Sequence, residues 1–391
     1  MNWDDVIIEA AATDTGMRRT NNQDSHAMVR ASNEESWRQR GHVYLVADGM
    51  GAHAVGELAS KMACDLIPHN YMKARSGTPA EAIVKAFREV SSLIHSRASA
   101  NRDFQGMGTT SSALLLLPEG ALVAHVGDSR VYRIRGDVID QLSFDHSLVW
   151  ELIKRNHLAP GQTNHSIPKN VITRSLGPEL EVDVDVEGPL EVRLGDVFLL
   201  CSDGLSGPVT DPEMGVFAAN YHPREACKFL INLANLRGGL DNITVVIVRI
   251  GSWIDPDSTE SASPGKALLG SAGKSLRPSL WQRVAAAVKN RGRSSAPTVV
   301  EDHPHRTAPC PLEEPMIQQL DELSRAVQDQ AVAQAWSLDW TALATLRRQL
   351  ADARSGGNRR SALRKLGEII ALLGQAARFA RKPAGPASPV H

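Results

Sequence analysis

The sequence predicts an α+β fold of antiparallel strands and covering helices, and two observations support this prediction. Short apolar runs rich in Val, Ile and Leu have the length and composition of buried strands, and they span residues 42–47, 112–117, 122–126, 131–134, 197–201 and 243–250. The runs between residues 112 and 143 follow one another with short turns, which indicates an antiparallel meander because parallel strands need long crossovers. A doubly wound parallel sheet is therefore excluded, and an antiparallel layered structure is favoured.

Three segments have the pattern of helices. Residues 79–100 place Ile83, Phe87, Val90 and Ile94 on one helical face. Residues 223–236 are a second candidate, and residues 56–71 are a third with a less regular pattern. Together with the strands, these helices predict one folded domain over residues 1–251.

The character of the chain changes after Gly251. Residues 252–311 are rich in Ser, Pro and Gly, which predicts a disordered, flexible linker. Apolar residues then recur at helical intervals over residues 312–382, with a stop signal at 355–358, so a helical hairpin or small bundle is expected there. Residues 383–391 are expected to be a disordered tail.

Composition narrows the class of protein. The chain has 391 residues with 43 basic and 44 acidic side chains, a balance that argues against a nucleic-acid-binding protein. Its four cysteines lie far apart, so neither a disulfide framework nor a cysteine zinc site is indicated. We find no apolar run of about 18 residues and no signal-peptide pattern, so no transmembrane segment and a cytoplasmic location are expected.

Aspartates recur where the predicted strands begin or end. Asp48 and Asp203 each follow an apolar run and precede a glycine, and Asp24, Asp128 and Asp241 lie at similar boundaries. Any one of them alone is more typical of a turn. If the strand ends share one side of the structure, however, the carboxylates converge, and their repulsion then requires a cation. An all-oxygen set suits Mg²⁺ or Mn²⁺, and two such ions activate a water towards phosphate esters.

An arginine pair precedes the first of these aspartates. Arg18 and Arg19 lie shortly before Asp24, and an arginine fork binds two phosphate oxygens at once. The ordinary alternative is that both arginines are solvent-exposed surface charge.

The ordered set of motifs resembles the metal-dependent serine/threonine phosphatases of the protein phosphatase 2C type, in their bacterial form. The matching blocks are residues 13–24, 47–51, 106–110, 127–130, 145–147, 171–177, 202–205 and 241–244, all in the order of that family. The resemblance covers roughly residues 5–251. It implies a sandwich of two antiparallel sheets flanked by helices, in α-β-β-α layers.

The resemblance also implies roles for the carboxylates. Asp48 is expected to bridge two Mn²⁺ or Mg²⁺ ions, and Gly49 to bind one of them through its backbone carbonyl. Asp203 and Asp241 are expected to complete the shell of the first ion, and Asp24 that of the second.

Further roles follow from the same resemblance. Asp128, with Asp203, matches an acidic site that takes a third, weaker ion. Arg19 matches the phosphate-binding arginine better than Arg18 does, and residues 146–170 match a variable flap beside the cleft. Gln23 and Ala52 depart from the family, which usually has Glu and Gly there, and Gln23 is expected to lower the metal affinity.

The expected activity is hydrolysis of phosphoserine and phosphothreonine in proteins by a metal-activated water, without a covalent intermediate. Phosphorylated proteins, including serine/threonine kinases and their substrates, are the expected partners, and the C-terminal helices are expected to dock a protein. Two alternatives remain open at this point. One is a pseudophosphatase that acts as a scaffold, favoured only by Gln23 and Ala52. The other is a metal-dependent phosphoesterase acting on small molecules or nucleic acid.

Overall fold

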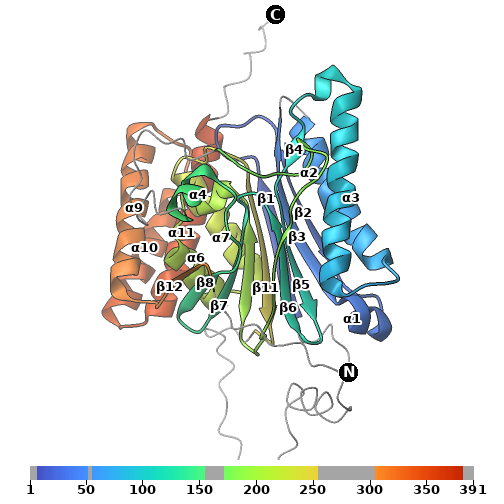
Figure 1. Ribbon diagram of the computed structural model, residues 1–391. Coiled ribbons are helices and arrows are strands. Elements are labelled where there is room, and N and C mark those ends of the chain that lie inside the picture. The colour runs from blue at the N-terminus through green and yellow to red at the C-terminus, as the bar shows by residue number, and fades with distance from the viewer. Residues whose placement is uncertain (1–6, 52–54, 155–170, 254–303, 382–391) are drawn as a thin grey trace, which may run out of the picture. The chain divides into compact units, whose positions relative to one another are not determined.

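Two six-stranded antiparallel sheets form the centre of the molecule (Figure 1). The computed structural model describes residues 7–51, 55–154, 171–253 and 304–381. Sheet A contains, in spatial order, β1 (Ile7–Asp14), β11 (Ile243–Ile250), β10 (Val197–Cys201), β7 (Arg130–Arg135), β8 (Val138–Gln141) and β12 (Arg306–Pro309). Sheet B contains β2 (Asp24–Val29), β3 (His42–Met50), β5 (Ser111–Leu117), β6 (Gly120–Val126) and β9 (Asp185–Leu190), with β4 (Gly108–Thr109) paired to β3.

Helices cover the outer face of each sheet, which confirms the predicted α-β-β-α layers (Figure 1). On the side of sheet B these are α1 (Glu34–Arg40), α2 (Val55–Lys73) and α3 (Pro79–Ala100), followed by the 3₁₀ turn η2 (Arg102–Phe104). On the side of sheet A they are α5 (Asp203–Ser206), α6 (Asp211–Asn220) and α7 (Pro223–Leu236). A short helix, α4 (Leu148–Lys154), follows β8. All three helices predicted from the sequence are present.

Each sheet is covered by helices on its outer face and by the other sheet on its inner face, which explains why the strand sequences are nearly continuous apolar runs. In β3, Tyr44 and Val46 belong to the core between the two sheets, whereas Val43 and Leu45 pack under α2 and α3. Because both faces of the strand meet a packed layer, apolar residues predominate until the strand reaches the edge of the sandwich, where Asp48 lies.

The predicted meander over residues 112–143 is wrong at one point. Strands β5 and β6 pair in sheet B, and β7 and β8 pair in sheet A, but β6 and β7 lie in different sheets. The chain crosses between the sheets at residues 127–129, a length that suffices because packed sheets lie about 10 Å apart. Gly127 makes the crossing with φ +116°, and a Cβ there would lie 2.6 Å from the Thr110 side chain. Asp128 thus lies between the two layers.

Three helices follow in residues 304–381, and one of them packs against the sandwich. They are α9 (Glu314–Ala333), α10 (Trp340–Ser355) and α11 (Arg359–Arg381), and a turn at Ala335, with φ +51°, separates the first two. Helix α11 packs on α7, and Leu366 and Ile370 share one apolar cluster with Phe229 and Leu230. The Tyr221 hydroxyl also donates to the Leu363 carbonyl. The described residues 304–381 and the sandwich therefore belong to one compact unit.

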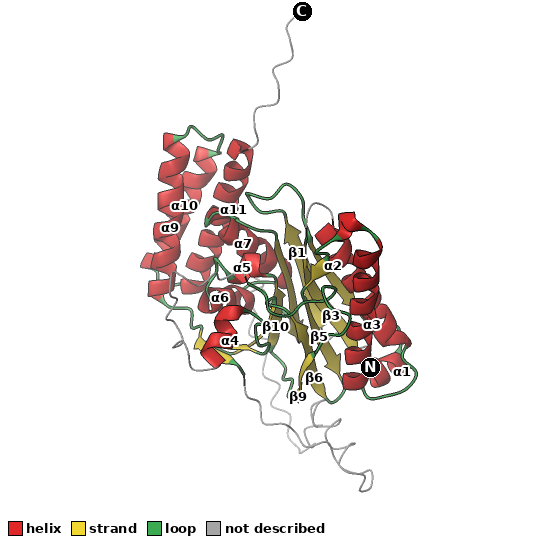
Figure 2. Cartoon of the chain, turned by 45° about the horizontal axis from the view of Figure 1, so that its top comes forward, coloured by secondary structure: helices red, strands yellow, loops and turns green. Residues whose placement is uncertain are grey.

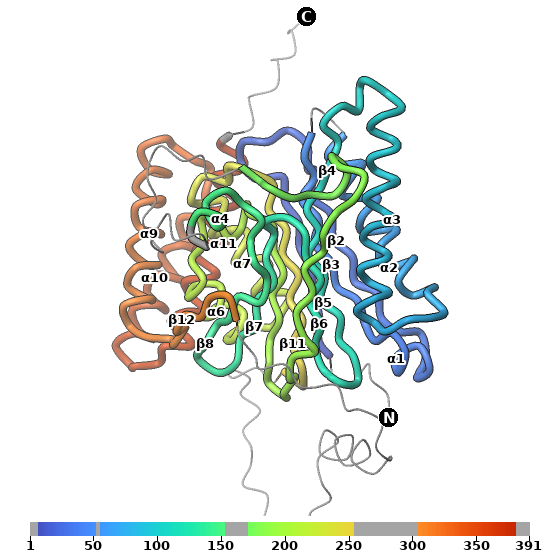
Figure 3. The backbone as a smooth tube through the Cα atoms, in the orientation of Figure 1, coloured from blue at the N-terminus to red at the C-terminus, as the bar shows by residue number. Residues whose placement is uncertain are grey.

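Part of the predicted linker is ordered. Within residues 252–311, Arg306–Pro309 form strand β12, which pairs with β8 at the edge of sheet A. Figure 3 shows β12, in orange, beside β8 and α6. Most of the linker and the tail at 383–391 lie outside the described residues. Within the described part of the chain, no helix is long and apolar enough to cross a membrane.

The shared cluster gives a stability prediction. Leu366 is fully buried between α11 and the sandwich, so Leu366→Ala should lower the free energy of unfolding by about 2–5 kcal/mol. Leu194→Ala, at a side chain 60% exposed, should change it by less than about 0.5 kcal/mol. Urea unfolding followed by circular dichroism measures both. If Leu366→Ala instead unfolds in two transitions, with the sheets unfolding at the wild-type urea midpoint, the sandwich and α11 do not share one apolar cluster.

Candidate functional site

Loops at one end of the sandwich bring the predicted site residues together, at the top in Figure 1 and towards the viewer in Figure 2. Asp24 begins β2 and lies opposite Asp48 near the end of β3. Asp203 begins α5 directly after β10, and Asp241 precedes β11. Arg19, in the loop between β1 and β2, places its Nη2 2.7 Å from Asp241 Oδ2. The convergence expected from the strand ends is therefore present.

The carboxylates lie close enough to raise one another's pKa. Burial, followed by the charges of Asp203 and Asp241, raises the pKa of Asp24 to about 7. Burial and then the charge of Asp203 raise the pKa of Asp128 to about 7 as well. Burial and the charge of Asp24 raise the pKa of Asp48 well above its usual value. The hydrogen bond to Asp241 raises the pKa of Arg19. The cluster thus holds more negative charge than its own arginine compensates.

Several carboxylate oxygens in the cluster lack a hydrogen-bond donor. Asp24 Oδ1, Asp128 Oδ1 and Asp203 Oδ1 are buried and unpartnered. Buried oxygens of this kind are costly unless a cation satisfies them, and hard divalent ions prefer oxygen ligands. In the conformation seen, however, no three His, Cys, Asp or Glu side chains of the described residues are already arranged around one ion. The donor chemistry therefore fits a divalent ion, although the described side chains are not already arranged around one.

Gly49 brings its backbone close to two other segments. A Cβ at this position would lie 2.1 Å from the Gly56 carbonyl and 2.6 Å from the Gln23 carbonyl. Only glycine allows that approach. The backbone at residue 49 therefore packs directly against the backbones of Gln23 and Gly56, beside the Asp48 carboxylate.

Two side chains that the sequence did not identify hold the carboxylate loops in place. The Asn242 side chain accepts from the Gln23 amide and donates to the carbonyls of Thr15 and Asn21, so it clamps the loop that carries Arg19. Ser202 Oγ donates to Asp24 Oδ2 at 2.7 Å. Both lie next to a predicted aspartate, and that adjacency was the available signal.

A second hydrogen-bond chain links the two sheets under the site. Thr110 Oγ1 accepts from the Asp48 amide at 2.9 Å and lies 2.7 Å from Ser129 Oγ. It thereby joins the end of β3 to the crossing segment that carries Asp128. The pairing fixes the separation of these two carboxylates along the cleft.

The beginning of the predicted flap is anchored to the same crossing segment. His146 exchanges two hydrogen bonds with the backbone of Gly127. Arg130 makes a bidentate ion pair with Asp145. Residues 155–170 of the predicted flap, and Ala52, are not among the described residues. Gln23 is described, and its Nε2 lies 3.4 Å from the Gly51 carbonyl.

A family model for protein phosphatase 2C matches residues 17–230. The chain belongs to the protein phosphatase 2C family. It is therefore a protein phosphatase, as the resemblance of the motifs implied.

Relatives and solved structures agree with this assignment. The phosphatase is 35% identical over 241 residues to Protein phosphatase PhpP of Streptococcus pneumoniae, covering 60% of this chain and 94% of that one. A serine/threonine phosphatase structure from S. agalactiae matches with TM-score 0.57 and 31% identity, over 62% of this chain and 99% of that chain. The catalytic domain of the serine/threonine protein phosphatase PstP, solved with 2 manganese ions, matches with TM-score 0.53 and 32% identity, over 63% of this chain and 99% of that one. Divalent-metal dependence follows from this family membership.

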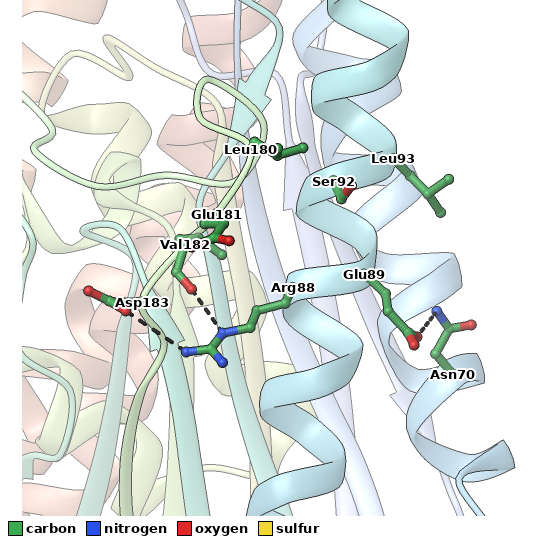
Figure 4. A pocket seen from close by; sticks show the side chains of 9 residues that line it. All are labelled: Asn70, Arg88, Glu89, Ser92, Leu93, Leu180, Glu181, Val182 and Asp183. Atoms are coloured by element: carbon green, nitrogen blue, oxygen red, sulfur yellow. Dashed lines mark hydrogen bonds and ion pairs between the residues drawn. The ribbon is translucent and has the colours of Figure 1, made fainter.

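Two pockets of the phosphatase differ in their relation to the site. A pocket of about 470 Å³ is lined by Asp128 and Asp203 together with Arg130 and Trp150, so it opens directly from the carboxylate cluster. A second pocket, of about 800 Å³, lies between α2, α3 and residues 180–183. Figure 4 shows Arg88 there, donating to the Val182 carbonyl and facing Asp183. None of the predicted site residues lines this second pocket.

A buried histidine beside the site predicts loss of stability in acid. His125 Nε2 lies 2.9 Å from the Gly127 carbonyl, and burial lowers its pKa from 6.5 to about 3. Between these values the unfolded chain binds a proton that the folded chain does not. The free energy of unfolding should therefore fall as pH drops from 6.5 towards 3, by up to about 1.4 kcal/mol per pH unit from this residue.

Comparison of unfolding at several pH values tests this assignment. His125→Gln should make the loss of stability in acid less steep, since no buried imidazole remains to be protonated on unfolding. His69→Gln, at an exposed histidine, is the matched control and should leave the slope unchanged. Equal slopes for the wild-type protein and His125→Gln would refute the role given to His125.

Proposed function

We propose that this phosphatase hydrolyses phosphoserine and phosphothreonine in proteins at the carboxylate cluster. The observation that carries the proposal is the convergence of five aspartates, three of them with a buried, unpartnered oxygen, beside one half-exposed arginine. Two divalent ions, Mn²⁺ or Mg²⁺, would supply an activated water nucleophile and neutralise the phosphate charge. The manganese ions in the PstP structure support this count.

The carboxylates would divide the binding of the ions. Asp48 lies centrally, since the charges of Asp24, Asp203, Asp128 and Asp241 all act on it, and this position supports its role as the bridging ligand. Gly49, next to it, would contribute its backbone carbonyl. Asp203 and Asp241 would hold one ion, and Asp24 the other. Asp128 shares its pocket with Asp203, which supports a third, weaker site there.

Arg19 would bind the phosphate. Its side chain is 52% exposed, and its Nη2 lies 2.7 Å from Asp241 Oδ2. If Asp241 held a cation, the guanidinium would be released to turn its paired N–H donors to two phosphate oxygens. The clamp formed by Asn242 keeps the Arg19 loop against β11, so the arginine stays beside the ions. In-line attack then depends on positioning and charge neutralisation.

Removal of one carboxylate should abolish metal-dependent turnover. Asp203→Asn should lower phosphate release from a phosphothreonine peptide by about 100-fold or more, as loss of a directly stabilising group does in other enzymes. It should also weaken Mn²⁺ binding measured by calorimetry, because a neutral amide is a poorer ligand. Asp65→Asn, at an exposed position on α2, is the matched control and should change neither quantity.

The outcome separates the remaining possibilities. Metal binding without release from any phosphopeptide would indicate a scaffold. Release from nucleotides or sugar phosphates, but not from phosphopeptides, would indicate a small-molecule phosphoesterase. Unchanged Mn²⁺ binding in Asp203→Asn would overturn the placement of the metal site.

The two neighbouring arginines offer a matched pair of variants. Arg19→Ala should raise KM for the phosphothreonine peptide about 10- to 100-fold, because a hydrogen bond to a charged group contributes about 1.5–3 kcal/mol. Arg18→Ala removes the same charge one residue away, where the side chain is exposed, and should leave KM within about twofold. Steady-state kinetics at saturating Mn²⁺ distinguishes them. Equal increases in KM for the two variants would mean that both arginines attract the substrate only through their positive charge, without a specific contact to the phosphate.

Partners and location belong to the same proposal. Phosphorylated proteins, including serine/threonine kinases and their substrates, would be the substrates, and the C-terminal bundle would dock a protein partner. Exposed Trp340 and Phe379 on that bundle support docking, at 40% and 69% exposure. All four cysteines are free and buried, which supports a reducing, cytoplasmic location.

A further inference from the structure

Strand β12 brings a segment from beyond the family match to the edge of the candidate active site. It lies after residue 230, where the match to the family model ends, and it pairs with β8 through Arg306 opposite Gln141. Thr307 Oγ1 donates to Asp140 Oδ1 at 2.8 Å. The Cys310 amide donates to the Asp137 carbonyl at 2.7 Å. The His305 amide donates to the Gln141 carbonyl at 2.9 Å, so the strand is held on both sides of the arginine.

Arg306 reaches into the pocket that opens from the carboxylate cluster. The same pocket of about 470 Å³ is lined by Asp128 and Asp203, by Trp150 of α4, and by Arg306. Arg306 Nε lies 3.3 Å from Asp211 Oδ2, and its side chain remains 55% exposed. One strand thus places a cation from the C-terminal region in a cleft formed otherwise by the catalytic domain.

The two arginines of the pocket differ in how far their charge is already compensated. Arg130 is 15% exposed and is held by the bidentate pair with Asp145. Arg306 has no ion-pair partner among the described residues except Asp211, and Asp211 also accepts from the Tyr132 hydroxyl and faces Arg130. Arg306 is therefore the better placed of the two to receive an anion from solvent.

The neighbouring residue ties this strand to the base of the flap. His305 packs against Phe144 with ring centroids 5.5 Å apart, and Phe144 packs edge-on against Trp150 at 5.2 Å. The aromatic chain joins β12 to α4, whose Trp150 also lines the pocket. The pocket lining therefore combines an apolar ring and the Arg306 cation with Asp128 and Asp203 of the carboxylate cluster.

We propose that Arg306 forms a subsite for an anionic side chain of the phosphoprotein substrate, close to the residue that is dephosphorylated. This inference rests on the proposed function, because it places the scissile phosphate at the carboxylate cluster. Trp150 would pack against the peptide, while Arg306 pairs with a carboxylate or with a second phosphate on the same chain. Substrate preference would thereby depend on a residue supplied from outside the segment that matches the family.

Kinetics of the full chain with three phosphothreonine peptides test the subsite. The peptides differ only in their flanking positions, which carry aspartates, a phosphoserine or alanines. The wild-type enzyme should prefer both anionic peptides over the alanine peptide. Arg306→Ala should raise KM for the anionic peptides by about threefold to fivefold, as expected for an exposed ion pair, with kcat unchanged. Arg306→Lys should keep most of the preference, since the charge remains.

Two control variants distinguish a specific subsite at Arg306 from a general effect of surface charge and from a disturbance of strand β12. Arg348→Ala removes an exposed arginine from α10 and should change no peptide's KM. Thr307→Val removes a hydrogen bond of the same strand and should affect all three peptides alike, if it affects any. Comparison of the two anionic peptides then shows whether the subsite prefers a carboxylate or a phosphate.

Hydrolysis of p-nitrophenyl phosphate distinguishes failure of this inference from failure of the proposed function. This small substrate lacks flanking residues, so Arg306→Ala should hydrolyse it at the wild-type rate. Normal hydrolysis combined with the same peptide preference in Arg306→Ala and wild type overturns the subsite alone. An equal loss on all substrates assigns Arg306 a structural role and also overturns it. A wild-type enzyme without metal-dependent hydrolysis of any substrate overturns the proposed function and the subsite together.

Discussion

Repulsion among carboxylates at one end of the sandwich is the constraint on which the site depends. Five aspartates meet where strands of both sheets begin or end, and burial with mutual repulsion raises the pKa values of Asp24, Asp48 and Asp128. Such a cluster is stable only with compensating cations or protons. The apolar strands below it provide a rigid frame that prevents the carboxylates from moving apart. The same frame explains why a metal-dependent phosphatase can be built on side chains that otherwise favour turns.

Neutral side chains hold the charged ones at their positions. Asn242 joins the loop of Arg19 to the start of β11, and Ser202 supports Asp24. Thr110 links Asp48 to the segment that crosses between the sheets near Asp128. Because these hydrogen bonds connect both sheets, the cluster is positioned by the packing of the layers as well as by its own loops. The C-terminal bundle strengthens this packing from the side of α7.

The local pattern of the sequence was sufficient for the main strands, for the helices α2, α3 and α7, and for the aspartates. Strands buried on both faces are mostly apolar, so β3, β5 and β11 were visible as runs. The local pattern was not sufficient where a short connection between two strands can pack in two different ways. The short turn between β6 and β7 suits a hairpin as well as a crossing between sheets, and the sequence favoured the wrong one. Strand β12 is short and contains a proline, so nothing local distinguished it from the linker around it.

By itself, the sequence determined an antiparallel α+β domain of the protein phosphatase 2C family and the aspartates proposed to bind its metal ions. The fold class follows from hydrophobic periodicity and the carboxylate cluster from the residue types at strand ends, whereas the family follows from the resemblance of the ordered motifs; all of these are local properties of the sequence. Only the tertiary structure decided that α11 packs on α7, and that Arg306 lies in the pocket shared with Asp128 and Asp203. Contacts such as Thr307 with Asp140, 167 residues apart, depend on which surfaces fit together after folding. Shape and charge complementarity between distant segments leaves no repeating pattern in a single sequence.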